Sequence, residues 1–187
     1  MPVEERFLIF EDTETTGLVP GKDEVIEVAS ILTDWDLKEV ARFHHKIQFD
    51  VKKMTPEAAA KNGYDPKVWS QEAVPFYKYQ AWMERHIKFG QVAVPVGHRV
   101  EFDRNILNER YFRPTGAFFK WSYRMIDTTG LAMTLKAAGV IKCESVRLEE
   151  VAKALDFKPE GEFHRAMADL QMSKKIFEFC VGMFQQE

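Results

Sequence analysis

The chain has 187 residues, 45% of them hydrophobic, and its formal net charge is −3. This length accommodates one well-buried domain, so residues 1–187 are predicted to form a single domain, and the apolar fraction excludes a disordered chain. The acidic balance excludes a large basic surface for non-specific duplex binding, but not a nucleic-acid substrate at an acidic site that carries metal ions.

Three strands open the chain. Apolar or alternating stretches bounded by turn residues indicate strands at residues 6–14, 24–32 and 41–49. The loops between them are short, and strands joined by short loops pair antiparallel. The first part of the chain is therefore predicted to form an antiparallel meander.

Two helices are expected next. Thr55 offers an N-cap, Pro56 suits the first helical turn, and Gly63 is placed to end a short helix. Residues 75–88 are rich in aromatic side chains and indicate a second helix, which Gly90 is placed to stop.

Helices and strands alternate in the rest of the chain. Residues 91–97 predict a buried strand, in which Pro95 indicates an irregular end. The remaining predicted elements are a helix at 102–113 ended by Pro114, a strand at 124–127, and helices at 128–139, 146–155 and 165–184. Strands first, then alternating helices and strands, predict a mixed sheet flanked by helices.

Cysteine usage and the N-terminus bear on location. Cys143 and Cys180 match no zinc-site spacing and provide no disulfide framework, which favours a reducing cytoplasm. The N-terminus contains acidic residues and lacks the apolar segment of a signal peptide. No apolar run approaches the ~18 residues of a membrane span, so no membrane partner is expected.

The segment DTETTG at 12–17 places two carboxylates behind the buried strand. Side chains alternate faces along a strand, so Asp12 and Glu14 project from the same side. Like charges held this close repel and lose hydration unless a cation lies between them. The alternative is that both residues only cap a turn, since Asp, Thr and Gly are ordinary turn residues.

Two further aspartates complete a candidate metal site. Asp103 follows a buried strand at the start of a helix, and Asp169 lies in the long last helix. Taken separately, each has a plain alternative as a helix N-terminal acid or a solvated helix charge. Four carboxylates without thiolates suit Mg²⁺ or Mn²⁺, and such sites commonly bind two ions roughly 3.5–4 Å apart.

His164 precedes Asp169 by five residues, at the start of the same helix. Its unperturbed pKa near 6.5 lets a neutral imidazole accept a proton from the attacking water, so it is the candidate general base. The alternative is a plain surface histidine. The adjacent His44 and His45 face opposite sides of a strand and cannot share a metal ion.

Three motifs together resemble a known family. DTETTG, then FD behind a buried strand, then HRAMAD resemble the exonuclease motifs of DnaQ-like 3′→5′ exonucleases, and the histidine places the chain in the DEDDh branch. VIEVASILTD, IDTTGLA and LEEVAKAL also lie where that family's elements fall, so the resemblance spans nearly the whole chain. It implies a ribonuclease H-like five-stranded sheet of order 3-2-1-4-5 flanked by helices, and 5′-mononucleotide products.

The same resemblance assigns roles to single residues. It implies that Asp12, Glu14, Asp103 and Asp169 bind the metal ions and that His164 acts as the base.

Substrate contacts follow by the same analogy. Leu18 and Phe102 would wedge the terminal bases, and Thr15 would contact the terminal 3′-hydroxyl. The chain departs from the family at KNGY, where Tyr64 stands near the expected position of the terminal nucleotide. It also carries Arg99 where many members have asparagine, which puts the substrate contacts there in doubt.

The aromatic and basic segment GAFFKWSYR, at 116–124, allows two interpretations. Its composition suits base stacking with phosphate contacts. Aromatic residues also form hydrophobic cores or dimer faces.

The predicted function is a metal-dependent 3′→5′ exonuclease that acts on single-stranded ends, with DNA favoured over RNA. The alternatives are an exoribonuclease or oligoribonuclease-type enzyme of the same family, which often works as a homodimer, or a non-catalytic nucleic-acid-binding module. The chain ends 18 residues after Asp169, so a free-standing enzyme is expected rather than one tethered to a polymerase.

Overall fold

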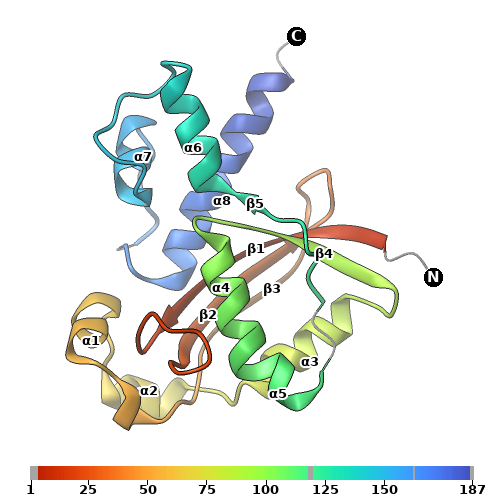
Figure 1. Cartoon of the computed structure of the whole chain (residues 1–187), viewed down its shortest axis with the longest axis vertical. Coiled ribbons are helices and arrows are strands. Elements are labelled where there is room, and N and C mark those ends of the chain that lie inside the picture. The colour runs from red at the N-terminus through yellow and green to blue at the C-terminus, as the bar shows by residue number, and fades with distance from the viewer. Residues whose placement is uncertain (1–3, 118–119, 162, 186–187) are drawn as a thin grey trace.

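A computed structural model describes residues 4–117, 120–161 and 163–185. One five-stranded sheet runs through the centre, with helices on both faces (Figure 1). The strand order is β3-β2-β1-β4-β5, which confirms the predicted order. The strands are β1 (Glu4–Thr15), β2 (Val25–Thr33), β3 (Glu39–Lys46), β4 (Gln91–Gly97) and β5 (Ile126–Asp127).

The pairing explains the mixed character of the sheet. β1 pairs antiparallel with β2, and β2 with β3, which confirms the predicted meander. β4 joins β1 in parallel, and β5 joins β4 in parallel. Pro95 does not make β4 irregular, contrary to the prediction, because it lies in register opposite Ile9 and the ladder continues to Val96.

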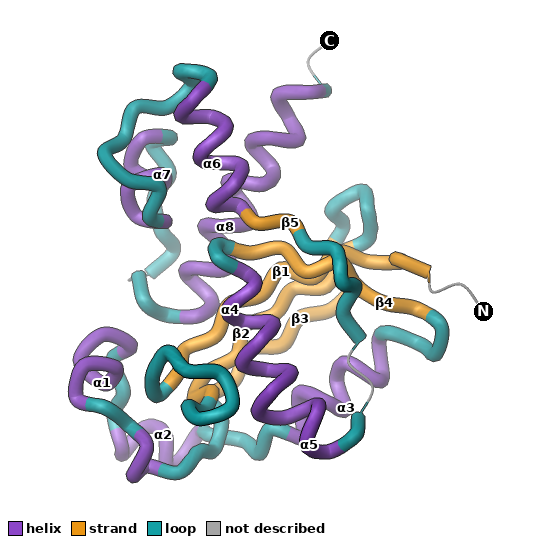
Figure 2. The backbone as a smooth tube through the Cα atoms, viewed as in Figure 1, coloured by secondary structure: helices purple, strands orange, loops and turns teal. Residues whose placement is uncertain are grey.

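The helices connect and cover the strands (Figure 2). In chain order they are η1 (Val51–Lys53), α1 (Pro56–Asn62), α2 (Pro66–Glu72), α3 (Tyr77–His86), α4 (Val100–Leu107), the π-helical turn η2 (Asn108–Phe112), α5 (Arg113–Thr115), α6 (Thr128–Ala137), α7 (Leu148–Ala154) and α8 (Ala166–Phe184). In the described part of the chain, no helix has the length and apolar character that crossing a membrane requires.

Two of these elements correct the sequence predictions. Pro114 does not end the helix after β4, because it lies in the first turn of α5, where a missing N–H costs nothing, and the helix ends at Gly116 with φ of 68°. α2 had no predicted counterpart, although Asp65 caps it by accepting from the N–H of Lys67 and Pro66 begins it.

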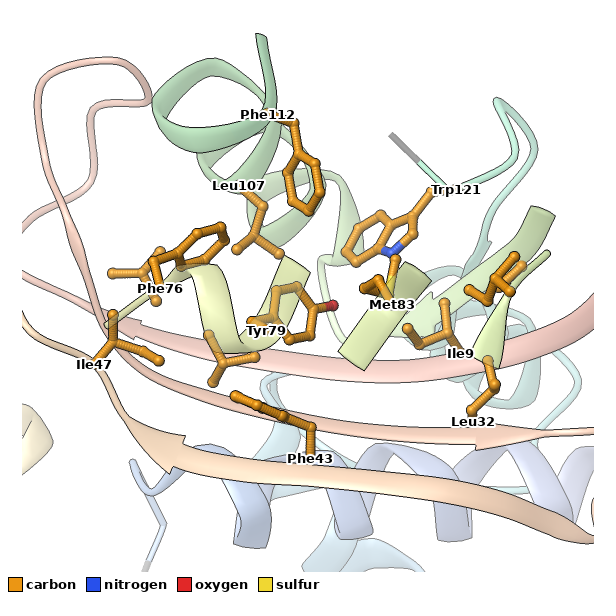
Figure 3. Close-up of a cluster of buried hydrophobic side chains, with 14 of the residues drawn as sticks. Ile9, Leu32, Phe43, Ile47, Phe76, Tyr79, Met83, Leu107, Phe112 and Trp121 are labelled. Atoms are coloured by element: carbon orange, nitrogen blue, oxygen red, sulfur yellow. The ribbon is translucent and has the colours of Figure 1, made fainter. Parts of the chain in front are cut away.

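Hydrophobic side chains form one cluster on each face of the sheet. On one face, α3 and α4 pack against β1, β2 and β3 through residues that include Ile9, Phe43 and Tyr79 (Figure 3). On the other face, α8 packs against Leu8 and Phe10 of β1. A third cluster joins α6, α7 and α8 beside the sheet. Neighbouring residues of β1 therefore face different helices, as strand alternation requires.

Candidate active site

The carboxylates of Asp12 and Glu14 lie at the end of β1. The parallel ladder with β4 stops at Phe10 and Val96, whereas the antiparallel ladder with β2 continues to Thr15. This end of β1 therefore extends beyond β4. Since Leu8 and Phe10 face α8, the alternation directs Asp12 and Glu14 to that same face.

Asp169 comes from α8 to meet the two strand residues. It lies in the first turn of the helix, between the buried Ala168 and Leu170, which pack the helix closely against the sheet. One carboxylate oxygen each from Asp12, Glu14 and Asp169 lies within 4.8 Å of the others. The structure thus brings together three of the four predicted metal-binding carboxylates.

Asp103 approaches from the other face of the sheet. It lies in the first turn of α4, is only 4% exposed, and its Oδ1 accepts hydrogen bonds from the backbone N–H (2.9 Å) and the hydroxyl (2.6 Å) of Thr13. Beyond the end of the β4 ladder, this carboxylate replaces the missing strand partner of Thr13. Burial raises the pKa of Asp103 to about 7, although the bonds from Thr13 oppose the shift.

Burial and mutual repulsion act together on the acidic groups. Burial raises the pKa of Glu14 to about 8, with further increases from Asp169, Glu27 and Asp103. The pKa of Asp12 lies well above its usual range, mainly through burial and then through repulsion from Asp103 and Asp169. The pKa of Asp169 rises to about 6, again mainly through burial. The acids thus remain partly protonated near neutral pH when no cation is bound.

This set of donors fits divalent cations. Carboxylate oxygens are the ligands that Mg²⁺ and Mn²⁺ prefer, and a cation between them would relieve the repulsion that raises each pKa. Asp12, Glu14 and Asp169 form the cluster, and Asp103 lies near enough to raise the pKa of Asp12.

His164 lies beside the carboxylates with its imidazole 38% exposed. Its backbone has a φ of 61°, and its N–H donates to both carboxylate oxygens of Asp169 at 3.2 and 3.3 Å. Its Nδ1 lies 3.9 Å from Oδ2 of Asp169. Burial lowers the pKa of His164, and the charges of Lys61 and Arg165 lower it further, which favours the neutral imidazole that a base requires.

Two neighbours of His164 had no predicted role. Oε1 of Glu149, at the start of α7, lies 3.2 Å from Nε2 of His164. The exposed Lys61 of α1 lowers the pKa of Glu14 and of Asp169 through its charge. Both residues come from helices far from HRAMAD in sequence, so no local motif could have revealed them.

A third unpredicted neighbour is Glu27 of β2. It lies opposite Glu14 in the ladder, is 4% exposed, and its Oε1 lies 2.7 Å from Nε2 of His44. The alternation of β2 could have placed it beside Glu14, but only once the register was known.

A cavity of about 540 Å³ opens onto the acidic cluster. Its lining includes Asp12, Glu14, His164 and Asp169, together with the predicted substrate contacts Thr15, Leu18 and Phe102. Leu18 is 80% exposed, so an apolar side chain is presented at the mouth of the cavity without a packing partner of its own.

Tyr64 lies elsewhere, which corrects its assignment. Its ring packs edge-on against Phe49 and Trp69 and lines a separate cavity of about 210 Å³. Asn62 lines the acidic cavity instead, and its Nδ2 donates to the carbonyl of Thr15 at 3.1 Å. Gly63, with φ of 64°, reverses the chain between the two residues and turns Tyr64 away.

A second cavity, of about 700 Å³, adjoins the first at Lys61, His164 and Asp169. Arg99 and Arg147 also line it. The Arg99 that departs from the family pattern adopts a φ of 65°, and its N–H donates to Oδ1 of Asp127 at 3.0 Å.

Segment 116–124 divides between core and surface. Trp121 is 4% exposed and belongs to the cluster between the sheet and α3 and α4, which favours the core interpretation for this residue. Tyr123 is 73% exposed, with the Arg124 guanidinium 4.7 Å from its ring centre. Phe118 and Phe119 lie outside the described residues.

Comparisons with known proteins point in one direction. Residues 9–177 match the family RNase_T, described as exonuclease. An oligoribonuclease of Shewanella amazonensis is 28% identical over 189 residues, and the match covers 96% of each chain. A DNA polymerase III of the PolC type from Thermotoga petrophila is 25% identical over 175 residues, which cover 94% of this chain.

The fold has solved counterparts. The zinc-bound E. coli exonuclease I in complex with single-stranded DNA superposes with a TM-score of 0.74 at 18% identity, covering 95% of this chain. The chain spans 12% of the length of the polymerase and 43% of that exonuclease chain.

Proposed function

The chain belongs to the exonuclease family RNase_T, DnaQ-like and of the ribonuclease H-like superfamily, and we propose that it is a metal-dependent 3′→5′ exonuclease acting on single-stranded ends. The observation that carries this proposal is the convergence of Asp12, Glu14 and Asp169 within 4.8 Å beside His164. Residues 1–187 would act as one exonuclease domain, because all three hydrophobic clusters are built around the one sheet or the helix α8 that covers it.

The acidic cluster would bind two divalent ions, Mg²⁺ or Mn²⁺. Such ions supply Lewis-acid chemistry, in which water is activated and the charge that develops on the departing oxygen is stabilised. Asp12, Glu14 and Asp169 provide the closest oxygens, and Asp103 adds negative charge from the opposite face of the sheet.

His164 would remove the proton from the attacking water. The Glu149 carboxylate is positioned to orient the imidazole through Nε2, which leaves Nδ1 on the side of Asp169. The lowered pKa of His164 keeps the acceptor neutral at physiological pH.

The 540 Å³ cavity would take the terminal nucleotide. Leu18 and Phe102 provide apolar surface for the base, and Thr15 lies at the same wall for the terminal 3′-hydroxyl. The Thr15 hydroxyl already donates to the carbonyl of Gly17 at 2.6 Å, so its acceptor lone pairs remain available to a substrate hydroxyl.

DNA and RNA are both candidate substrates. DNA is supported by the likeness to an exonuclease I bound to single-stranded DNA. RNA is supported by the Shewanella oligoribonuclease, because that match covers 96% of both chains and hence a protein of similar size. A homodimer and independence from a polymerase stay predictions.

Labelled oligomers test the proposal. DNA and RNA 20-mers of one sequence, labelled at the 5′ end, are incubated with Mg²⁺, with Mn²⁺ or with EDTA. We expect a ladder that shortens from the 3′ end only with metal, and the faster of the two ladders identifies the preferred sugar. Oligomers that are bound but stay intact with either metal would instead support a non-catalytic binding module.

A further inference from the structure

A second groove lies away from the acidic cluster, between β3 and α3. It has a volume of about 500 Å³. Phe43 and His45 of β3 form one wall, and Trp82, Arg85 and Lys78 of α3 form the other. The two elements pack together at the edge of the sheet, where β3 has no further strand beside it (Figure 1).

Ring systems line the floor of this groove. The ring centres of His45 and Phe43 are 4.8 Å apart, those of Phe43 and Trp82 are 5.8 Å apart, and those of Trp82 and His86 are 5.6 Å apart. The four rings form a continuous row across both elements. Trp82 is half-buried, because its inner side stacks on Tyr79 at 5.7 Å while it still lines the groove.

Cations flank the row of rings. Lys78, Trp82 and Arg85 follow the i, i+4, i+7 spacing and so share one face of α3, whereas Glu84 lies on the opposite face. Among the described residues, no carboxylate lines the groove, and neither Lys78 nor Arg85 makes an ion pair.

Other charged groups near the groove add to the same positive potential. Arg42 also lines it but is paired with Glu39 at 2.8 Å. Burial lowers the pKa of His86, and the charges of Arg85 and Lys88 lower it further. A chain with a formal charge of −3 thus carries here a groove whose uncompensated charges are all positive.

We propose that this groove is a second binding site for single-stranded nucleic acid, in which Lys78 and Arg85 contact phosphates and a base stacks against Trp82. Cations beside an aromatic platform suit single strands, because every base has a face that can stack and every linkage carries a charge. The choice of occupant rests in part on the proposed function, which supplies the substrate class.

The groove lies within reach of a strand bound at the acidic cluster. Asp12 is in register with Ala29, and Ala29 with His44, so about 10 Å separates the Cα atoms of Asp12 and His44 at the usual spacing of ~4.8 Å between strands. His45, the next residue, lines the groove on the other face. A 20-mer is long enough to contact both sites at a rise of roughly 3.4 Å per nucleotide, and a trinucleotide is too short.

Salt-dependent binding tests the proposal without catalysis. Fluorescently labelled dT20 is titrated in EDTA at several salt concentrations into wild type, a Lys78→Ala/Arg85→Ala double variant and a Lys142→Ala control. Lys142 is exposed in the loop between α6 and α7 and does not line the groove. Each phosphate contact on a single strand contributes about −0.7 to the slope of log K against log salt, so the double variant should lose about 1.4 in magnitude.

Three outcomes decide the matter. A reduced slope and weaker dT20 binding in the double variant, with the control unchanged and a smaller effect on dT3, would support the groove. A slope and Kd equal to those of the control would overturn it. An oligoglutamate of equal charge that binds more tightly than dT20, and loses this binding in the double variant, would instead assign the groove to acidic peptides.

The proposed function and the groove can fail separately. A wild type that degrades no oligomer with Mg²⁺ or Mn²⁺ contradicts the exonuclease, but the binding comparison in EDTA still measures the groove. Degradation with full dT20 affinity in the double variant would leave the exonuclease in place and remove the groove.

Discussion

Alternate residues of β1 serve the two faces of the sheet. Asp12 and Glu14 point to the face of α8 and meet Asp169, whereas Thr13, between them, bonds to Asp103 on the face of α4. One strand end thereby links the aspartates of two helices that lie on opposite sides of the sheet. The position of the carboxylates depends on the bond that Thr13 makes.

The hydroxyl of Thr13 can be removed with little change in shape. In Thr13→Val, Oδ1 of Asp103 keeps the backbone donor but loses the hydroxyl at 2.6 Å. We expect the free energy of unfolding to fall by about 1–3 kcal/mol, as for a bond to a charged acceptor, and kcat to fall as well. Urea denaturation and steady-state kinetics measure both effects.

Thr134→Val provides the matched control. The hydroxyl of Thr134 also donates to one acceptor, the carbonyl of Gly130, but on the exposed side of α6. Equal losses of stability in the two variants would mean that the bond between Thr13 and Asp103 has no special weight.

The imidazole of His164 is expected to act on the proton and not on the metal ions. His164→Ala should lower kcat by about 10²–10⁴, the usual contribution of a general base, while Mn²⁺ affinity measured by calorimetry stays close to that of wild type. The backbone N–H that contacts Asp169 is retained in this variant. An unchanged kcat would remove the histidine from the mechanism.

At the scale of elements, Glu24 ties the start of β2 to η1 and η2. It accepts the backbone N–H of Asp50 at 2.8 Å, and its carboxylate pairs with Lys53 at 2.8 Å and with Arg110. Burial alone would raise the pKa of Glu24, but the bonds from Lys53 and Arg110 outweigh it and lower the pKa to about 2. This carboxylate therefore stabilises the fold in its charged form.

Loss of this charge should matter only above acidic pH. Because the pKa of Glu24 is lower in the folded state, its contribution is complete above the unfolded value of 4.5 and is lost as pH falls toward 2. Glu24→Gln should cost of the order of 3 kcal/mol at pH 7, at 1.36 kcal/mol per pKa unit, and little at pH 2. Denaturation at both pH values measures the difference; an equal cost at both would contradict the assignment of the shift to charge.

Elements with a local signal were predictable. The caps at Thr55 and Gly63 bound α1 as expected, and the meander followed from its short loops. Tertiary context decided the rest. Pro95 stays in the ladder of β4, and Pro114 falls in a first helical turn, so neither proline breaks its element.

The candidate site was predicted to a similar extent. The motifs located the residues that line the acidic cavity, from Asp12 and Thr15 to His164 and Asp169. They could not show that Asp103 bonds to Thr13 or that Glu149 contacts His164, since these pairs are 90 and 15 residues apart. Such contacts depend on how α4 and α7 pack, which no local pattern encodes.

For the whole molecule, the acidic cluster links stability to pH and to metal. The pKa of Glu14 is about 8 in the folded state against 4.5 for a free glutamate. Between these values the folded state retains a proton that the unfolded state releases, so in EDTA the contribution of Glu14 to stability falls as pH rises. Mg²⁺ or Mn²⁺ should restore that stability, because a ligand that binds only the folded state stabilises it.

Glu14→Gln isolates this effect from other titrating groups. In EDTA, the Tm of the variant should rise relative to that of wild type between pH 5 and pH 8, and Mn²⁺ should raise the Tm of wild type more than that of the variant. Differential scanning calorimetry measures both changes. A Tm difference that does not vary with pH would contradict the raised pKa of Glu14.

The shared metal site of the two strand carboxylates and α8 can be observed directly. A crystal soaked in Mn²⁺ and measured for anomalous scattering should show a peak between Asp12, Glu14 and Asp169, with their oxygens as ligands. The account would be contradicted by a well-diffracting soaked crystal in which Mn²⁺ binds elsewhere and no peak lies between these three carboxylates.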